Sequence, residues 1–535
     1  MLNKLFLFAA CLSASATMAQ ASKDPSYNSK RSWWDLTHYN LNVEVVLEDS
    51  SIFGYNDISY KSLNGSEKQK MQIDMQEPML IDSIIQEGKS IRFTKKDNSR
   101  YIVAVKPDNG VNTIRVYFHG KPPVSQQPPW SSGFVWNKDN NGNPWIASVC
   151  QDAGASMWWP CKDHPKDEVD SMAISITCPQ PLKAVSNGRL ISVNHLGSDR
   201  AKFTWKVINP INAYGVNLSV GDYAYFADSL TGELGKLDAD YYVLPYNVEK
   251  ARNQFKDAQR TITALEHWFG PYPFYEDGYK LVETPYLGME HQSCVAYGNG
   301  YQNGYRGYDL SGSGWGLKFD FIIIHESGHE WFANSVTNSN EADMWIHEGF
   351  TSYSENLFLE YFYGAEAGAA YTIGTRRNIA NDKPIIGNYT LGEAGSSDMY
   401  YKGANILHML RTIHGDTEDW RRILRLLNET YFHKTVSSAE VEKFMAKEMK
   451  LNLDAFWNQY LRETTVPTLE YEIQGKKLLF KFTGAVKKFA MPVRVKINGE
   501  DYVLDASVKN RRVKLDEPIE TVETNPNYYI NYKPL

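Results

Sequence analysis

The sequence contains few cysteines, only five in 535 residues. Cys11 lies in an apolar N-terminal stretch, which leaves Cys150, Cys161, Cys178 and Cys294 for the rest of the chain. So few cysteines in so long a chain exclude a scaffold built from disulfides, and their spacing does not reveal any pairing.

The chain also lacks blocks of like charge. It carries 56 Lys and Arg against 63 Asp and Glu, a net charge of −7. Without a basic cluster, the sequence predicts no nucleic-acid partner. The hydrophobic content of 42% excludes disorder over most of the chain.

Long apolar runs are missing as well, since a membrane-spanning helix needs about 20 apolar residues. A shorter apolar stretch, from Leu5 to about Ala16, follows Lys4 and precedes small residues suited to cleavage. This pattern predicts a secretory signal peptide over residues 1–21 and an exported protein, either periplasmic or extracellular. A membrane anchor is the alternative, but the stretch is short for one. Nothing in the sequence indicates the oligomeric state.

Length and patterning predict three domains after the signal peptide. Residues 22–230 hold alternating segments rich in β-branched and aromatic residues, which are typical of strands. Residues 231–465 show mainly helical periodicity, including one expected helix over residues 317–336, and residues 466–535 return to strand patterns. We therefore expect a multidomain α+β protein with a β-rich N-terminal domain, a mainly helical middle domain and a small β-sandwich-like C-terminal domain.

Two histidines, His325 and His329, flank Glu326 in the pentapeptide HESGH, directly after an apolar run. Residues four apart lie on one face of a helix, so both imidazoles can point at one atom. Neutral imidazole suits zinc, and a catalytic zinc needs three protein ligands and an open position. Glu348, at the start of another amphipathic segment, completes the set if its helix packs antiparallel on the first. The sequence predicts one zinc ion per chain.

The residues around these three ligands allow alternative interpretations of the site. The alternative to a metal is a buried helix, but unpaired polar groups directly after Ile322, Ile323 and Ile324 would cost on the order of several kcal/mol. His347 projects about 100° away from its neighbour on a helix, so we do not expect it to bind the metal. Glu355 lies seven residues after Glu348, on the same helix face, where it could accept a hydrogen bond from a ligand histidine; the alternative is a surface carboxylate.

Several segments together resemble the gluzincin zinc aminopeptidases, the family of aminopeptidase N, which includes a leukotriene-hydrolase branch. HESGH and the later WIHEGF are similar to the zinc signature and to W-L-N-E-G-F. The stretch from Leu287 to His291, LGMEH, resembles the exopeptidase motif G-x-M-E-N, and YYKG, which begins at Tyr400, resembles Y-x-K-G. QDAGASMWWPCKDHP, which begins at Gln151, resembles a substrate-contacting segment followed by P-C-x-D-x-P. The resemblance runs from roughly residue 30 to the C-terminus.

The resemblance implies a thermolysin-like catalytic domain and a role for each matching residue. His325, His329 and Glu348 would bind zinc, which activates a water molecule. Glu326 would be the general base, and Tyr400 would stabilise the oxyanion.

The resemblance also implies how a peptide substrate is held. Glu290 would bind the free α-ammonium group through charge-assisted hydrogen bonds. The backbone at Gly288 and Met289 would pair with the extended peptide as a strand does, and Gln151 would add a polar contact. These roles imply a zinc aminopeptidase that acts on peptides.

Three positions depart from the family pattern: His291 replaces the usual Asn, Leu287 replaces a small residue, and Gln151 stands where many members have Glu. The sequence also ends after the small β domain, where the family often has a large helical domain. A zinc endopeptidase or oligopeptidase with an open cleft therefore stays open as an alternative, as does an epoxide or ester hydrolase built on the same site. A non-enzymatic protein with a relic metal site is disfavoured because Glu326 and Tyr400 are intact.

Overall fold

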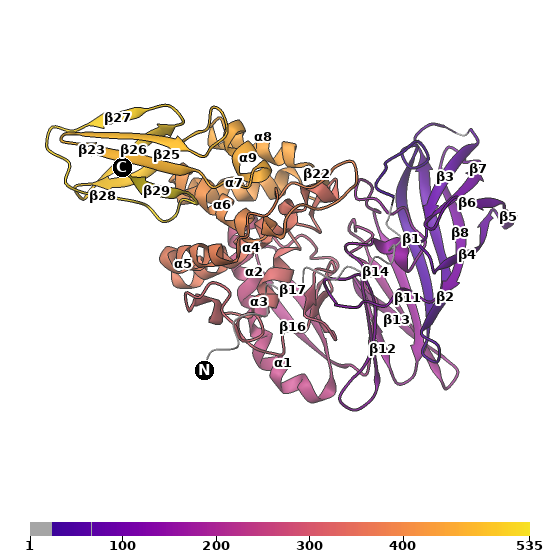
Figure 1. The fold of residues 1–535 in the computed structure, drawn as a ribbon. Helices are drawn as coiled ribbons and strands as arrows, with labels where there is room; N and C mark the ends of the chain where they lie inside the picture. Colours follow the sequence, from indigo (N-terminus) through magenta and orange to yellow (C-terminus); the bar gives the residue numbers. More distant parts are fainter. Residues whose placement is uncertain (1–23, 66) are drawn as a thin grey trace.

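The computed structural model describes residues 24–65 and 67–535. The predicted signal peptide, residues 1–21, therefore lies outside the described residues. Figure 1 shows a helical body between a group of N-terminal sheets and a small pair of C-terminal sheets. This is the predicted α+β architecture, and the fold class is confirmed. Within the described residues, no helix has the length and apolarity needed to cross a bilayer.

The N-terminal part is built from three sheets. The largest has the strand order β13-β14-β11-β1-β2-β8-β4-β5, and the others are β12-β15-β10-β9 and β3-β7-β6. Their bounds are β1 (Trp34–Val46), β2 (Ser51–Ser62), β3 (Gln69–Asp74), β4 (Leu80–Gln86), β5 (Lys89–Ile91), β6 (Phe93–Lys95), β7 (Arg100–Val105), β8 (Val111–Gly120), β9 (Gly133–Lys138), β10 (Pro144–Val149), β11 (Met172–Pro179), β12 (Lys183–Val185), β13 (Arg189–Leu196), β14 (Arg200–Val207) and β15 (Ser219–Gly221). Strand β1 illustrates why these segments form sheets with one buried face. Leu41, Val43 and Val45 are buried, while the residues that alternate with them are only partly buried.

A five-stranded sheet, in the order β16-β17-β18-β20-β19, begins the middle part. Its strands are β16 (Ala224–Gly232), β17 (Gly235–Val243), β18 (Tyr279–Glu283), β19 (Gly288–Met289) and β20 (Val295–Tyr297). Because β16 starts at Ala224, this sheet begins ahead of the boundary expected at residue 231. The short strand β19 lies at the edge of the sheet, so one side of its backbone has no neighbouring strand in the described sheet.

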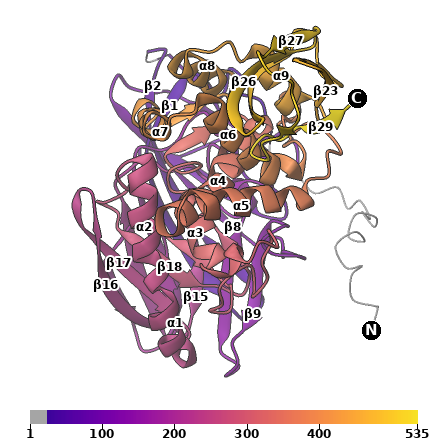
Figure 2. The ribbon, with the colours of Figure 1, turned by 90° about the vertical axis from the view of Figure 1, so that its left-hand side faces the viewer.

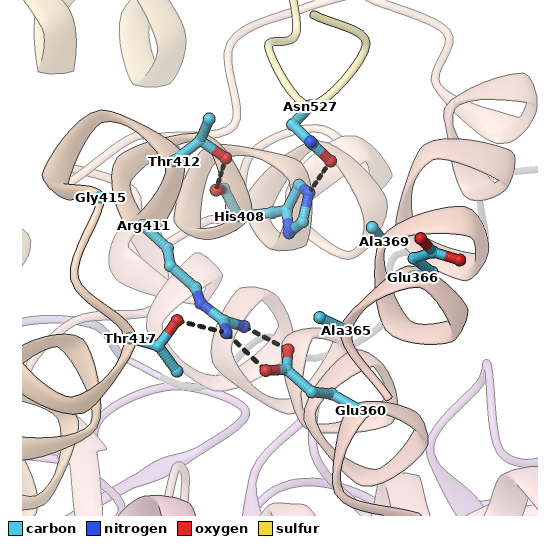
Figure 3. Close-up of a pocket in the computed structure, with 10 residues that line it drawn as sticks. All are labelled: Glu360, Ala365, Glu366, Ala369, His408, Arg411, Thr412, Gly415, Thr417 and Asn527. Carbon is cyan, nitrogen blue, oxygen red and sulfur yellow. Dashed lines mark hydrogen bonds and ion pairs between the residues drawn. The ribbon is translucent and has the colours of Figure 1, made fainter. Parts of the chain in front are cut away.

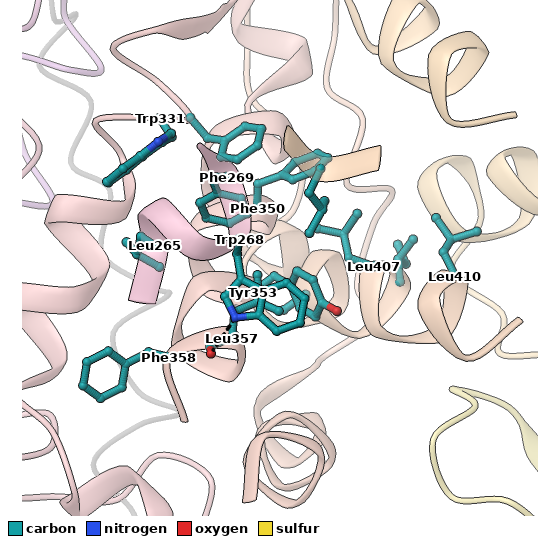
Figure 4. Close-up of a cluster of buried hydrophobic side chains, with 14 of the residues drawn as sticks. Leu265, Trp268, Phe269, Trp331, Phe350, Tyr353, Leu357, Phe358, Leu407 and Leu410 are labelled. Carbon is teal, nitrogen blue, oxygen red and sulfur yellow. Dashed lines mark hydrogen bonds between the residues drawn. The ribbon is translucent and has the colours of Figure 1, made fainter. Parts of the chain in front are cut away.

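Nine α-helices of the described chain form the helical body. They are α1 (Val248–Gln254), α2 (Lys256–Phe269), α3 (Phe321–Gly328), α4 (Trp345–Tyr363), α5 (Ala365–Thr375), α6 (Tyr401–His414), α7 (Thr417–Thr430), α8 (Ser438–Met449) and α9 (Asp454–Arg462). Helices α2, α4 and α6 share a core in which Trp268, Phe350 and Leu407 are buried with their neighbours (Figure 4). Each such side chain contributes about 1.5–3 kcal/mol of transfer free energy, so the helix that carries the third expected ligand has a rigid support.

The helix predicted over residues 317–336 forms only in part, and this prediction was wrong in its extent. Asp320 is the N-cap of helix α3, and its side chain accepts hydrogen bonds from the backbone N–H groups of Ile322 and Ile323. The helix ends at Gly328. Beyond it, the Asn334 N–H donates to the His329 carbonyl, a spacing that no α-helix has. The chain then forms β21 (Val336–Asn338), which pairs in parallel with β22 (Lys434–Val436). Pairing with a distant strand replaces the last helical turns.

The C-terminal part is a sandwich of two small sheets, β27-β24-β23-β29 and β26-β25-β28. Its strands are β23 (Thr468–Gln474), β24 (Lys477–Thr483), β25 (Ala490–Ile497), β26 (Glu500–Ser507), β27 (Arg511–Lys514), β28 (Val522–Glu523) and β29 (Asn531–Pro534). In Figure 2 these strands adjoin helices α6 and α9. The Tyr460 hydroxyl donates to the Tyr529 carbonyl at 3.0 Å, which fixes the sandwich to α9.

A cavity of about 300 Å³ lies where the sandwich meets helices α4 to α7 (Figure 3). Its walls include the ion pair between Glu360 and Arg411, and His408, whose Nε2 lies 2.8 Å from Asn527 Oδ1. None of the residues predicted for the site lines this cavity.

Candidate active site

Helices α3 and α4 pack antiparallel, as the sequence analysis required. The ring of Phe319, just before α3, lies 5.5 Å from that of Phe358 near the end of α4. At the other end, Phe332 stacks on Phe350 with ring centres 4.3 Å apart. The pairing of early with late residues brings the first turn of α4 to the end of α3.

This packing gathers the three expected zinc ligands. Glu348 Oε2 lies 3.6 Å from His325 Nε2 and 3.4 Å from His329 Nε2, and one ligand atom from each residue lies within 4.8 Å of the others. All three residues are buried. Glu348 Oε2 has no hydrogen-bond partner within the described chain. A buried carboxylate oxygen facing two imidazole nitrogens is costly unless a cation joins them, so the residues fit one zinc ion with two nitrogen ligands and one oxygen ligand.

The imidazoles of the two expected histidine ligands are oriented by contacts to their Nδ1 atoms. His325 Nδ1 lies 2.9 Å from Glu355 Oε1, and the other oxygen of Glu355 accepts a hydrogen bond from Tyr371 at 2.5 Å. His329 Nδ1 lies 3.0 Å from the Phe332 carbonyl and 3.0 Å from the Thr351 hydroxyl. A proton on each Nδ1 leaves Nε2 free for the metal. Glu355 thus occupies the place predicted for a supporting acceptor.

His347 points elsewhere, as the helical geometry predicted. Its Nε2 accepts a hydrogen bond from the Asn338 backbone N–H at 2.8 Å.

Glu326 lies beside the ligand cluster. Its carboxylate, that of Glu290 and an imidazole nitrogen of His329 lie within 4.8 Å of one another. Burial raises the pKa of Glu326 to about 7, against the opposing effect of the neighbouring imidazoles. Gly288 on β19 faces this carboxylate, since a Cβ there would be only 2.6 Å from Glu326 Oε1. The absence of a side chain at Gly288 lets the edge strand pass close to the Glu326 carboxylate.

Tyr400 immediately precedes α6 and reaches the same site. Its ring lies 6.0 Å from that of His325 in a stacked arrangement. Burial raises the pKa of Tyr400 well above its usual range, and the carboxylates of Glu348 and Glu290 raise it further. The hydroxyl therefore stays protonated and can donate a hydrogen bond.

Glu290 follows β19 and is buried. Its Oε1 accepts a hydrogen bond from Gln151 Nε2 at 2.7 Å and another from the Tyr214 hydroxyl at 3.1 Å. Gln151 thus lies in the site as predicted, but its amide contacts this carboxylate. The sequence alone does not identify Tyr214, because no motif distinguishes it from the rest of the 34 tyrosines.

The other two departures from the family pattern are both buried. Leu287 packs in the main hydrophobic core. Neither ring nitrogen of His291 has a hydrogen-bond partner in the part of the chain that the structure describes. Burial lowers the pKa of His291 to about 3, so the ring is neutral.

The fold and the ligand set define a zinc metallopeptidase. The sequence matches the Peptidase family M1 domain over residues 254–460 and the Peptidase M1 N-terminal domain over residues 36–214. The chain therefore belongs to peptidase family M1.

Several proteins are similar to this chain in sequence. The chain is 25% identical over 465 residues to leucine aminopeptidase 2 of Vanderwaltozyma polyspora, covering 81% of this chain and 66% of the relative. It is 20% identical over 503 residues to probable aminopeptidase 2 of Sulfurisphaera tokodaii, covering 88% and 61%. Leukotriene A-4 hydrolase of Xenopus laevis is 23% identical, covering 64% and 57%. The chain thus spans somewhat less than two thirds of these relatives.

Solved structures share the fold. A mutant M1 zinc metallopeptidase of Deinococcus radiodurans bound to a Tyr-Ser-Ala substrate superposes with a TM-score of 0.67 at 18% identity, covering 82% of this chain and 96% of that one.

Proposed function

We propose that the protein is a zinc-dependent aminopeptidase that removes N-terminal residues from peptides. The observation that carries this proposal is the position of Glu290, whose carboxylate lies within 4.8 Å of Glu326 and His329 atoms. A fixed negative charge beside the metal ligands suits the α-ammonium group of a peptide whose first carbonyl lies at the metal.

The residues divide the chemistry among them. A zinc ion held by His325, His329 and Glu348 would act as a Lewis acid toward water and the scissile carbonyl. Glu326 takes the proton of the attacking water and passes it to the leaving amine. The Tyr400 hydroxyl donates to the carbonyl oxygen as negative charge develops there.

Strand β19 supplies the backbone edge along which the substrate binds. Gly288 and Met289 pair with β20 on one side, while the other side of β19 is the edge of the sheet. An extended peptide can add there as a further strand, with its N-terminus toward Glu290. An endopeptidase or oligopeptidase would share the metal site but would gain nothing from a buried carboxylate at this end, and no observation favours an epoxide or ester hydrolase.

We further propose that the protein is exported. Support comes from the N-terminal pattern of Lys4, an apolar stretch and small residues. N-terminal sequencing of the protein recovered outside the cytoplasm should begin near residue 22, whereas an intact Met1 there would contradict the proposal.

A panel of aminoacyl p-nitroanilides tests the activity. Each amide is supplied with a free or an N-acetylated amine, with and without a zinc chelator. The proposal requires chelator-sensitive hydrolysis of the free-amine set alone. Hydrolysis of blocked amides or internal bonds would instead support the endopeptidase.

A further inference from the structure

The carboxylate of Glu290, which we propose to bind the amine, accepts hydrogen bonds from residues of the N-terminal part. Glu290 belongs to the middle part, yet both hydrogen bonds to its Oε1, from Tyr214 and Gln151, come from loops of the N-terminal part. Hydrogen bonds from two directions to one carboxylate oxygen fix the rotation of the group. They therefore set where its second oxygen points.

The two donors are themselves joined. The Cys150 thiol, next to Gln151, donates to the Tyr214 carbonyl at 3.4 Å. This hydrogen bond links the two loops that carry the donors to Glu290.

A second connection ties the donor loop to the acceptor segment. Asn187 is buried, and its Nδ2 donates to the Gly215 carbonyl at 2.8 Å and to the Gln292 carbonyl at 2.7 Å. Asn334 Nδ2 donates to the Glu290 carbonyl at 2.9 Å. The backbones on both sides of the contact are therefore fixed, as a contact that must hold its geometry requires.

The Tyr214 hydroxyl serves this contact as a donor. Burial raises the pKa of Tyr214 well above its usual range, and the carboxylates of Glu290, Glu341 and Glu348 raise it further. A protonated hydroxyl beside a carboxylate donates to it, which is the stronger class of hydrogen bond.

We propose that Tyr214 is a positioning residue of the amine site: by holding Oε1 of Glu290, it turns the carboxylate toward the α-ammonium group of the substrate. The inference rests on the proposed aminopeptidase function and adds to it a residue of the N-terminal β-rich part that acts on the substrate only through Glu290. Tyr214 acts through Glu290, so removing Glu290 must make Tyr214 dispensable.

The test compares the Tyr214→Phe variant with the wild-type protein on L-alanine p-nitroanilide and its N-acetylated form. We expect KM for the free amine to rise about tenfold, the usual effect of losing one hydrogen bond to a charged group, with kcat little changed. Tyr223→Phe is the matched control, since its hydroxyl also makes a buried hydrogen bond, to the Glu283 carbonyl at 3.0 Å, away from Glu290.

A double-variant cycle separates positioning from a merely structural effect. In a Glu290→Ala background, adding Tyr214→Phe should leave KM unchanged within about twofold, because the residue acted upon is gone. An equal loss in both backgrounds would mean general damage and would overturn the inference. So would an unchanged KM in the single variant of a protein that is selective for free amines. A wild-type protein that hydrolyses blocked amides equally well would overturn the proposed function itself, and this inference with it.

Discussion

His325 is held between two carboxylates, with Nδ1 2.9 Å from Glu355 and Nε2 3.6 Å from Glu348. The first contact sets the tautomer and makes the second nitrogen a better ligand. We expect Glu355→Gln to lower the zinc affinity by roughly 10- to 100-fold, measured by competition with a chelator of known affinity. The exposed Glu366→Gln serves as the control. Equal affinities for the two variants would show that Glu355 does not support the ligand.

Glu326 is predicted to carry protons without binding the metal. The cluster of His325, His329 and Glu348 is complete without it. Glu326→Gln should therefore lower kcat by at least about 10²- to 10⁴-fold, the usual contribution of a general base. The zinc content, measured on the same preparation, should stay at one ion per chain. Retained turnover would refute the assigned base, and loss of zinc would show that the residue is a ligand.

Gly288 offers a steric test of the edge strand. An added Cβ would lie 2.6 Å from Glu326 Oε1 and 2.9 Å from Ile322 Cγ2. Since Glu326 must shift to make room, we expect Gly288→Ala to lower kcat/KM by at least about tenfold, as misplacement of a catalytic group does. Gly110→Ala is the control, because a Cβ there meets nothing within 4 Å. Similar kinetics for both variants would place the substrate and base away from this glycine.

The metal centre could be predicted from sequence, whereas its surroundings could be predicted only in part. His325 and His329 are one helical turn apart, so local geometry sufficed. The C-terminal limit of α3 was missed because it depends on pairing between Val336 and Lys434, far along the chain. Tyr214 could not be identified because no motif marks it and because its partner Glu290 lies 76 residues later. Spacing within one helix can be read from a sequence, and contacts between domains cannot.

We expect His408, at the junction with the C-terminal sandwich, to make the free energy of unfolding depend on pH. Burial lowers the pKa of His408 to about 4, Asn527 opposes this through its hydrogen bond, and the charges of Arg411 and Arg376 add to it. Between about pH 6.5 and pH 4 the unfolded chain binds this proton and the folded chain does not, so the free energy of unfolding falls as the pH falls through that window. His408→Gln keeps a donor for Asn527 but cannot titrate. Urea unfolding at pH 7.5 and pH 5 should show the wild-type protein losing about 2 kcal/mol more than the variant, on the order that one such shift supplies. Equal losses in the two proteins would show that His408 takes up its proton in the folded state.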